Sequence, residues 1–117
     1  MSEIIYWVLA VRIHPGQQET FKAFSAELIE STRNEVDTLN YEWSLSGDGE
    51  VCHIYERYAD SRAIMVHIER NGDTVGKLFA VSTPLSFVVY GAPQDEVKAA
   101  LADLNPVYMT PLDGFSR

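Results

Sequence analysis

Cysteine is scarce in this chain of 117 residues: Cys52 stands alone, so no intrachain disulfide can form, and a reducing compartment is favoured. Basic residues are also few, with 9 Lys and Arg against 17 Asp and Glu and a net charge of -8, which repels nucleic acid and anionic membranes. The longest apolar run, residues 4–11, is much shorter than the ~20 residues of a spanning helix. With no signal peptide evident, we expect a cytoplasmic protein whose partners are neither nucleic acid nor membrane.

The usual motifs of metal and nucleotide chemistry are missing as well. No glycine-rich phosphate loop and no Gly-x-Ser-x-Gly elbow occurs in the sequence. His14 and His53 have no carboxylate or cysteine at ligand spacing, so we expect no metal site. Cys52 lacks basic neighbours and is interpreted as a small buried hydrophobe.

The composition, 46% apolar and 22% charged, is that of one globular domain over residues 1–117. Apolar periodicity and turn residues predict strands at 4–12, 41–46, 51–59 and 85–90, with a hairpin turn at 47–49. They also predict an amphipathic helix over about 17–35, with Val36 near its apolar stripe. A second helix begins at the N-cap Asp60 and stops at Asn71-Gly72, before a short helix from Asp73. A last helix follows Pro93 and ends at Asn105-Pro106, before a docked tail.

This order of elements predicts an α+β, ferredoxin-like βαββαβ core over residues 3–91, with a four-stranded antiparallel sheet and both main helices on one face. Residues 92–117 add the final helix and the tail. The first strand is apolar on both faces, so its uncovered face needs a partner. A second copy of the chain is the simplest one, and we expect a homodimer formed through the sheet faces.

One stretch carries a family resemblance. The second hairpin strand and the helix after it contain Glu56, Tyr58 and Asp60 at alternate positions, followed by His67 seven residues later. Together with the Pro15-Gly16 turn and residues 41–43, this pattern resembles the antibiotic biosynthesis monooxygenase family over about residues 3–91. The resemblance implies a dimeric α/β barrel with a ligand pocket between sheet and helices. Family members include oxygenases that act on anthrones and hydroquinones without metal or flavin, and relatives that degrade haem. The second histidine that many members carry is missing here.

The residues suggest roles within such a pocket. His67, with an ordinary pKa near ~6.5, is the candidate catalytic base for a phenolic proton, or else a core histidine bonded to a backbone carbonyl or to Glu56. Glu56 is the candidate that orients His67, although it could instead pair with Arg57, Arg62 or a backbone amide. Strand parity places Glu56 and Tyr58 on one face, which we expect to face the helices.

Aromatic residues are the candidate walls for a flat ligand, with Tyr58, Trp43 and Tyr90 as the expected substrate-binding residues and ordinary core packing as the alternative. Together with these residues, the resemblance implies a cofactor-independent monooxygenase that oxidises a small hydroquinone-like or anthrone-like aromatic molecule with O2. The alternative is a non-catalytic dimeric protein that binds a small molecule. Haem degradation ranks third because no basic cluster is available for the propionates.

Overall fold

The computed structural model describes residues 3–117. In chain order the elements are β1 (Ile5–Ile13), α1 (Gln18–Thr32), β2 (Thr38–Leu45), β3 (Val51–Tyr58), α2 (Ser61–Ala80), β4 (Ser82–Tyr90), α3 (Asp95–Leu101), the 3-10 turn η1 (Ala102–Leu104) and β5 (Val107–Met109). The predicted βαββαβ order is confirmed for the first six elements. No helix within residues 3–117 is long and apolar enough to cross a membrane.

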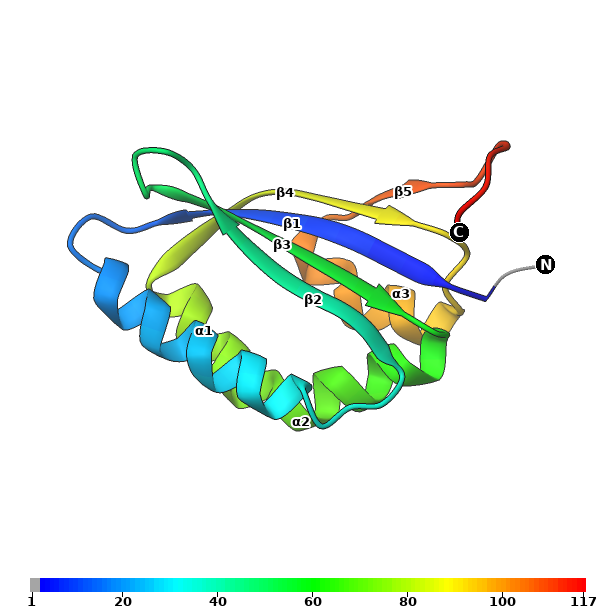
Figure 1. Ribbon diagram of the computed structural model, residues 1–117, viewed down its shortest axis with the longest axis horizontal. Helices are drawn as coiled ribbons and strands as arrows, with labels where there is room; N and C mark the ends of the chain where they lie inside the picture. Colours follow the sequence, from blue (N-terminus) through cyan, green and yellow to red (C-terminus); the bar gives the residue numbers. More distant parts are fainter. Residues whose placement is uncertain (1–2) are drawn as a thin grey trace.

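The sheet has five strands in the order β2-β3-β1-β4-β5, and Figure 1 shows it as one twisted layer above the helices. The pairs β1–β3, β1–β4 and β2–β3 are antiparallel, as predicted, whereas β5 runs parallel to β4. The prediction of a four-stranded, wholly antiparallel sheet is therefore wrong. The βαβ crossover through α3 adds a parallel strand at an edge that a four-stranded sheet would leave unpaired.

The last strand forms because the chain reverses sharply after η1. Asn105 adopts a left-handed conformation with a φ of 51°, and Pro106 prevents further helix. The backbone then follows the edge of β4, and the Gly91 N–H donates to the Met109 carbonyl at 3.1 Å. Beyond β5 the tail no longer packs on the protein at Leu112, whose side chain is 99% exposed.

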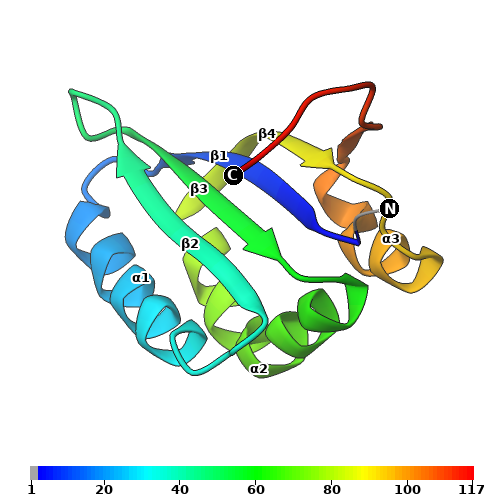
Figure 2. The ribbon, with the colours of Figure 1, turned by 45° about the vertical axis from the view of Figure 1, so that its right-hand side comes forward.

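All three helices cover the same face of the sheet, as Figures 1 and 2 show. The side chains of β1 that point toward them, Trp7, Leu9 and Val11, are buried, and α1 and α2 contribute Phe21, Leu28 and Ile64 to the same core. Alternate residues of the strand and the apolar stripes of the helices thus pack against each other in a single layer. The core therefore lies between sheet and helices, where the resemblance also places a ligand.

Helix α2 is one continuous helix, so the predicted stop at Asn71-Gly72 is wrong. Asp60 caps its first turn, as predicted, by accepting a hydrogen bond from the Ala63 N–H at 2.9 Å. The Asn71 side chain points into the protein and donates to the His67 carbonyl oxygen at 2.9 Å, so it supports the helix instead of ending it. The apolar spacing continues through Val75, Leu78 and Phe79, and burial of that stripe outweighs the low helix propensity of Gly72.

The outer face of the sheet carries no helix. Tyr6, Val8 and Tyr90 lie there half-buried, with Tyr6 stacked on Tyr90 at 4.9 Å between ring centroids. Val107 and Met109 extend this apolar surface onto β5, where they are 56% and 48% exposed. We use "outer sheet face" below for this surface, which a single chain leaves uncovered.

Candidate functional site

Helix α2 and strand β3 bring the two candidate catalytic residues together beneath the helices. His67 lies on the buried side of α2, one turn before Asn71, and Glu56 lies on the helix-facing side of β3. The His67 Nε2 atom is 3.5 Å from Glu56 Oε1. The predicted proximity of these two residues is therefore present in the structure.

The second nitrogen of the imidazole meets a carboxylate that sequence reasoning missed. His67 Nδ1 is 3.0 Å from Oε1 of Glu35, and His67 is 5% exposed. Thr38 Oγ1 and Asn71 Nδ2 donate to the same carboxylate at 2.9 Å each, and Arg70 Nε is 3.4 Å from it. Glu35, and not Glu56, is thus the side chain that several neighbours hold against the ring.

Glu35 was missed because α1 was expected to continue to residue 35, with Val36 near its buried stripe. Helix α1 ends at Thr32, and the Glu35 N–H donates to the Thr32 carbonyl at 2.9 Å in a turn that points Glu35 inward. Glu35 is 8% exposed, whereas Val36 is 88% exposed. Hydrophobicity alone predicts a buried Val36 and an exposed Glu35. The observed burial of Glu35 is explained by the hydrogen bonds that its carboxylate accepts inside the protein.

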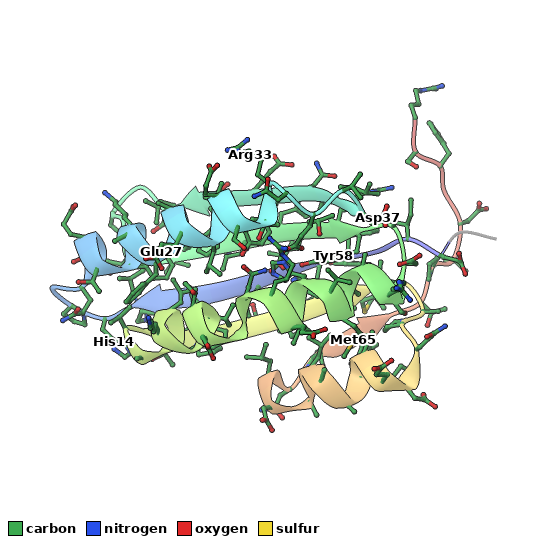
Figure 3. The ribbon with its side chains drawn as sticks, turned by 90° about the horizontal axis from the view of Figure 1, so that it is seen from below. His14, Glu27, Arg33, Asp37, Tyr58 and Met65 are labelled. Atoms are coloured by element: carbon green, nitrogen blue, oxygen red, sulfur yellow. The ribbon has the colours of Figure 1, made fainter. Side chains whose placement is uncertain are left out.

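The surroundings of Glu56 favour the protonated form of its carboxyl group. Burial raises the pKa of its carboxyl, an effect that the nearby His67 and the hydrogen bond from Tyr58 oppose in part. The Tyr58 hydroxyl donates to Glu56 Oε1 at 2.5 Å, and burial raises the pKa of that phenol as well, followed by the charge of Glu56. The strand parity that placed Glu56 and Tyr58 on the helix-facing side is confirmed, since both are buried beneath the helices. Figure 3, which looks onto the helices, shows Tyr58 in the gap between α1 and α2.

A cavity of about 370 Å³ opens beside this pair. It is within the range of small-molecule sites, and aliphatic and aromatic side chains form most of its wall. Glu56 and His67 both line it, with Tyr41 and Trp43 from β2 and Trp7 from β1. An acid and a base therefore face an apolar, half-enclosed space, where an electrostatic interaction is stronger than in water.

The three expected aromatic wall residues have different positions. Trp43 lines the cavity, and the ring of Tyr41, which was not among the three expected residues, meets the His67 ring edge-on at 5.2 Å between centroids. Tyr58 lies against His67 at 5.6 Å and reaches the cavity only through Glu56. Tyr90 does not belong to this site, because alternation along β4 turns it to the outer sheet face, against Tyr6.

The remaining candidate groups lie away from this chemistry. Cys52 is buried, and burial raises the pKa of its thiol to about 11, so the thiol stays protonated at neutral pH. Among residues 3–117, no group of three His, Cys, Asp or Glu side chains is arranged to hold a metal ion. His14 donates or accepts a hydrogen bond with Thr83 at 2.8 Å, and His53 is exposed on the far side of β3.

The family model for antibiotic biosynthesis monooxygenases matches residues 4–71, which is more than half of the chain. The chain therefore belongs to the antibiotic biosynthesis monooxygenase family. The matched segment includes Glu35, Glu56 and His67, but it ends within α2. The comparison with curated protein sequences found no match.

Solved structures share the fold. MupZ from Pseudomonas fluorescens is 24% identical over 99% of this chain and 96% of its own, with a TM-score of 0.87. SnoaB, a cofactor-independent oxygenase from Streptomyces nogalater, is 16% identical over 80% of this chain and 96% of its own, with a TM-score of 0.67. Rv0793 from Mycobacterium tuberculosis is 22% identical over 79% of this chain and 96% of its own, with a TM-score of 0.67. These similarities establish the α+β ferredoxin-like architecture.

Proposed function

We propose that this protein is a cofactor-independent monooxygenase that oxidises a small electron-rich aromatic molecule, such as a hydroquinone or an anthrone, with O2. The observation that carries the proposal is the pair formed by His67 and Glu56 at the wall of an apolar cavity. Membership of the family and the likeness to a cofactor-independent oxygenase support the same chemistry.

In this proposal Glu35 fixes the imidazole. The Nδ1–H of His67 donates to the Glu35 carboxylate at 3.0 Å, which leaves Nε2 as the basic nitrogen on the side of Glu56. The orienting role that we predicted for Glu56 thus falls to Glu35. Glu56 lines the cavity together with His67, 3.5 Å from Nε2, and exchanges protons with that nitrogen.

The reaction begins when His67, directly or through Glu56, takes the acidic proton of the substrate. The anion passes one electron to O2, and the two radicals combine to form a C–O bond at the ring carbon. The resulting peroxide anion takes the proton back from the site, and the hydroperoxide loses water to leave a carbonyl. For an anthrone, the CH2 group and O2 thus become C=O and H2O. A positioned general base contributes ~100-fold to 10,000-fold to such a step.

Oxygen uptake by the purified protein with a panel of hydroquinones and anthrones tests the proposal. We expect uptake above the uncatalysed rate, with a loss of at least ~100-fold in kcat for His67→Ala. His53→Ala is the matched control, because His53 is exposed on the opposite side of β3, and it should leave the rate unchanged.

The same experiment separates the alternatives. Tryptophan quenching without oxygen uptake would identify a small-molecule-binding protein and overturn the oxygenase proposal. Uptake unaffected by His67→Ala would remove His67 from the role of base. Haem degradation is less well supported, because none of the residues that line the cavity is Lys or Arg, which would pair with the propionates.

We also propose that two copies associate through the outer sheet face to form a homodimer. The half-buried Tyr6, Val8 and Tyr90 and the exposed Val107 and Met109 form an apolar surface that a second copy would cover. In a two-fold dimer the same patch of both subunits meets across the symmetry axis, so one apolar face is enough to form the interface.

A further inference from the structure

The cavity has a second end that the proton-transfer chemistry does not use. Beyond Glu56 and His67 it continues along α2 past Ile68, Gly72 and Gly76. Residues four apart on a helix lie on one face, so these three form a continuous strip of wall. Ala100 of α3 and Asp103 of η1 line the same end of the cavity. Figure 3 shows α2 lying between α1 and α3. We call this end, between α2 and the α3–η1 segment, the slot.

The two glycines leave the slot open. A Cβ atom built on Gly72 or Gly76 would meet no atom within 4 Å, so the space beside each is vacant. Neither glycine has the positive φ that would require this residue, and glycine is unfavourable inside a helix. Both glycines are exposed and line the cavity, so the slot opens to solvent at these positions and has room for a ligand there.

The walls of the slot determine what kind of group fits there. Ile68, Val75, Phe79, Ala100 and Leu104 provide apolar surface. Asp103 is the charged residue at this end, and its exposed carboxylate lies at the surface. An anionic group in the slot would be repelled by Asp103, whereas a neutral chain would bury apolar surface at no electrostatic cost.

We propose that the substrate carries an uncharged, largely apolar chain that lies in the slot while its oxidisable ring lies at Glu56 and His67. This inference rests on the proposed function for the position of the ring. The family model ends at residue 71, and apart from Ile68 the residues named for the slot come after it. The expected substrate is thus an alkyl-substituted aromatic compound and not a bare ring.

Binding of methylhydroquinone and heptylhydroquinone under argon tests the chain without requiring turnover. Both tryptophans of the protein, Trp7 and Trp43, line the cavity, so their fluorescence reports occupancy. We expect the heptyl compound to bind at least tenfold more tightly than the methyl compound, because the extra methylenes are buried. Equal affinities, or no binding of either compound, would overturn the proposal.

Paired variants locate the chain in the slot. Ala100→Leu fills the slot from α3, whereas the neighbouring exposed Ala99 does not line the cavity and gives the matched control Ala99→Leu. We expect Ala100→Leu and Gly76→Leu to abolish the preference for heptyl over methyl and to change methyl binding less than twofold. Ala99→Leu should keep the preference. Leucine is a strong helix former, so thermal unfolding should show all three variants folded.

The charge of the chain end gives an independent readout. With a heptyl chain ending in a carboxylate, wild type should bind at least fivefold more weakly than with the corresponding alcohol, and Asp103→Asn should reduce that difference. A preference for heptyl that survives Ala100→Leu, or a carboxylate effect that Asp103→Asn does not change, would overturn the proposed position of the chain. Chain-length discrimination without oxygen uptake would instead refute only the oxygenase proposal.

Discussion

His67 is held between two buried carboxylates, Glu35 on Nδ1 and Glu56 on Nε2. One imidazolium cannot neutralise two charged carboxylates, and a second buried negative charge is costly. Glu35 receives hydrogen bonds from Thr38 and Asn71 and has Arg70 beside it, whereas Glu56 receives a hydrogen bond from the Tyr58 hydroxyl and has no cation beside it other than His67 among the contacts described. Of the two carboxyl groups, Glu56 is therefore the one that stays protonated, because burial raises its pKa.

Glu56→Gln should change how stability depends on pH. A carboxyl whose pKa is higher in the folded protein stabilises the fold below its unfolded pKa of ~4.3, and that contribution is lost as pH rises through the folded pKa. Glutamine keeps an acceptor for Tyr58 and never ionises. We expect the free energy of unfolding of Glu56→Gln, relative to wild type, to increase from pH 5 to pH 8 in urea titrations.

Glu27→Gln provides the control for this experiment, because Glu27 is exposed on α1. Its difference from wild type should stay nearly constant over the same range. A difference for Glu56→Gln that is flat with pH, or that falls toward pH 8, would contradict a raised pKa at Glu56.

Among the secondary-structure elements, α2 links the chemistry to the shape of the cavity. Its side toward α1 carries His67 and Asn71, which meet Glu35, and its side toward α3 carries Gly72 and Gly76, which line the slot. A helix that ended at residue 71 would have kept the contacts of His67 and Asn71 with Glu35 but lost the wall of the slot. Continuity through two glycines therefore costs helix stability and leaves space for a ligand.

Gly72→Ala should stabilise the protein. The site is helical, and an added Cβ meets nothing within 4 Å, so alanine gains backbone entropy without a clash. We expect an increase of about 0.5–1 kcal/mol in the free energy of unfolding, measured by urea denaturation with the m-value unchanged. A decrease would mean that Gly72 is needed for the backbone conformation or that the vacant space is filled in solution.

For the whole molecule, the decisive feature is that all three helices lie on one face of the sheet. The outer sheet face keeps its apolar side chains, and Val8 lies near its middle, opposite Tyr55 on β3 and Val88 on β4. A net charge of -8 opposes association, so burial of this apolar surface has to outweigh that repulsion in the proposed dimer.

Val8→Glu should separate the proposed dimer. We expect light scattering to give twice the chain mass of 13.2 kDa for wild type and 13.2 kDa for the variant, because two facing carboxylates would be buried at the interface. Val36→Glu makes the same change at a valine that is 88% exposed on the other side of the molecule, and it should leave the mass unchanged. A wild-type mass of 13.2 kDa, or a dimeric Val8→Glu, would refute association through this face.

Several features followed from the sequence itself. Alternation along residues 51–58 placed Glu56 and Tyr58 on the helix-facing side, and the N-cap Asp60 located the start of α2. These predictions succeeded because they depend on local periodicity and hydrogen bonding, which neighbouring residues determine. The residue types also led us to expect Glu56 beside His67, and the two come from segments joined by a short connection.

Other features depended on contacts between distant segments. Glu35 reaches His67 across 32 positions of sequence, Tyr90 is excluded by its register on β4, and β5 exists because the edge of β4 offers unpaired backbone groups. Asn71 reads as a helix stop in sequence but is retained in α2 by its bond to Glu35. Local propensities differ by at most about 1 kcal/mol between such alternatives, and a buried hydrogen bond to a charged group exceeds that, so tertiary structure decided them.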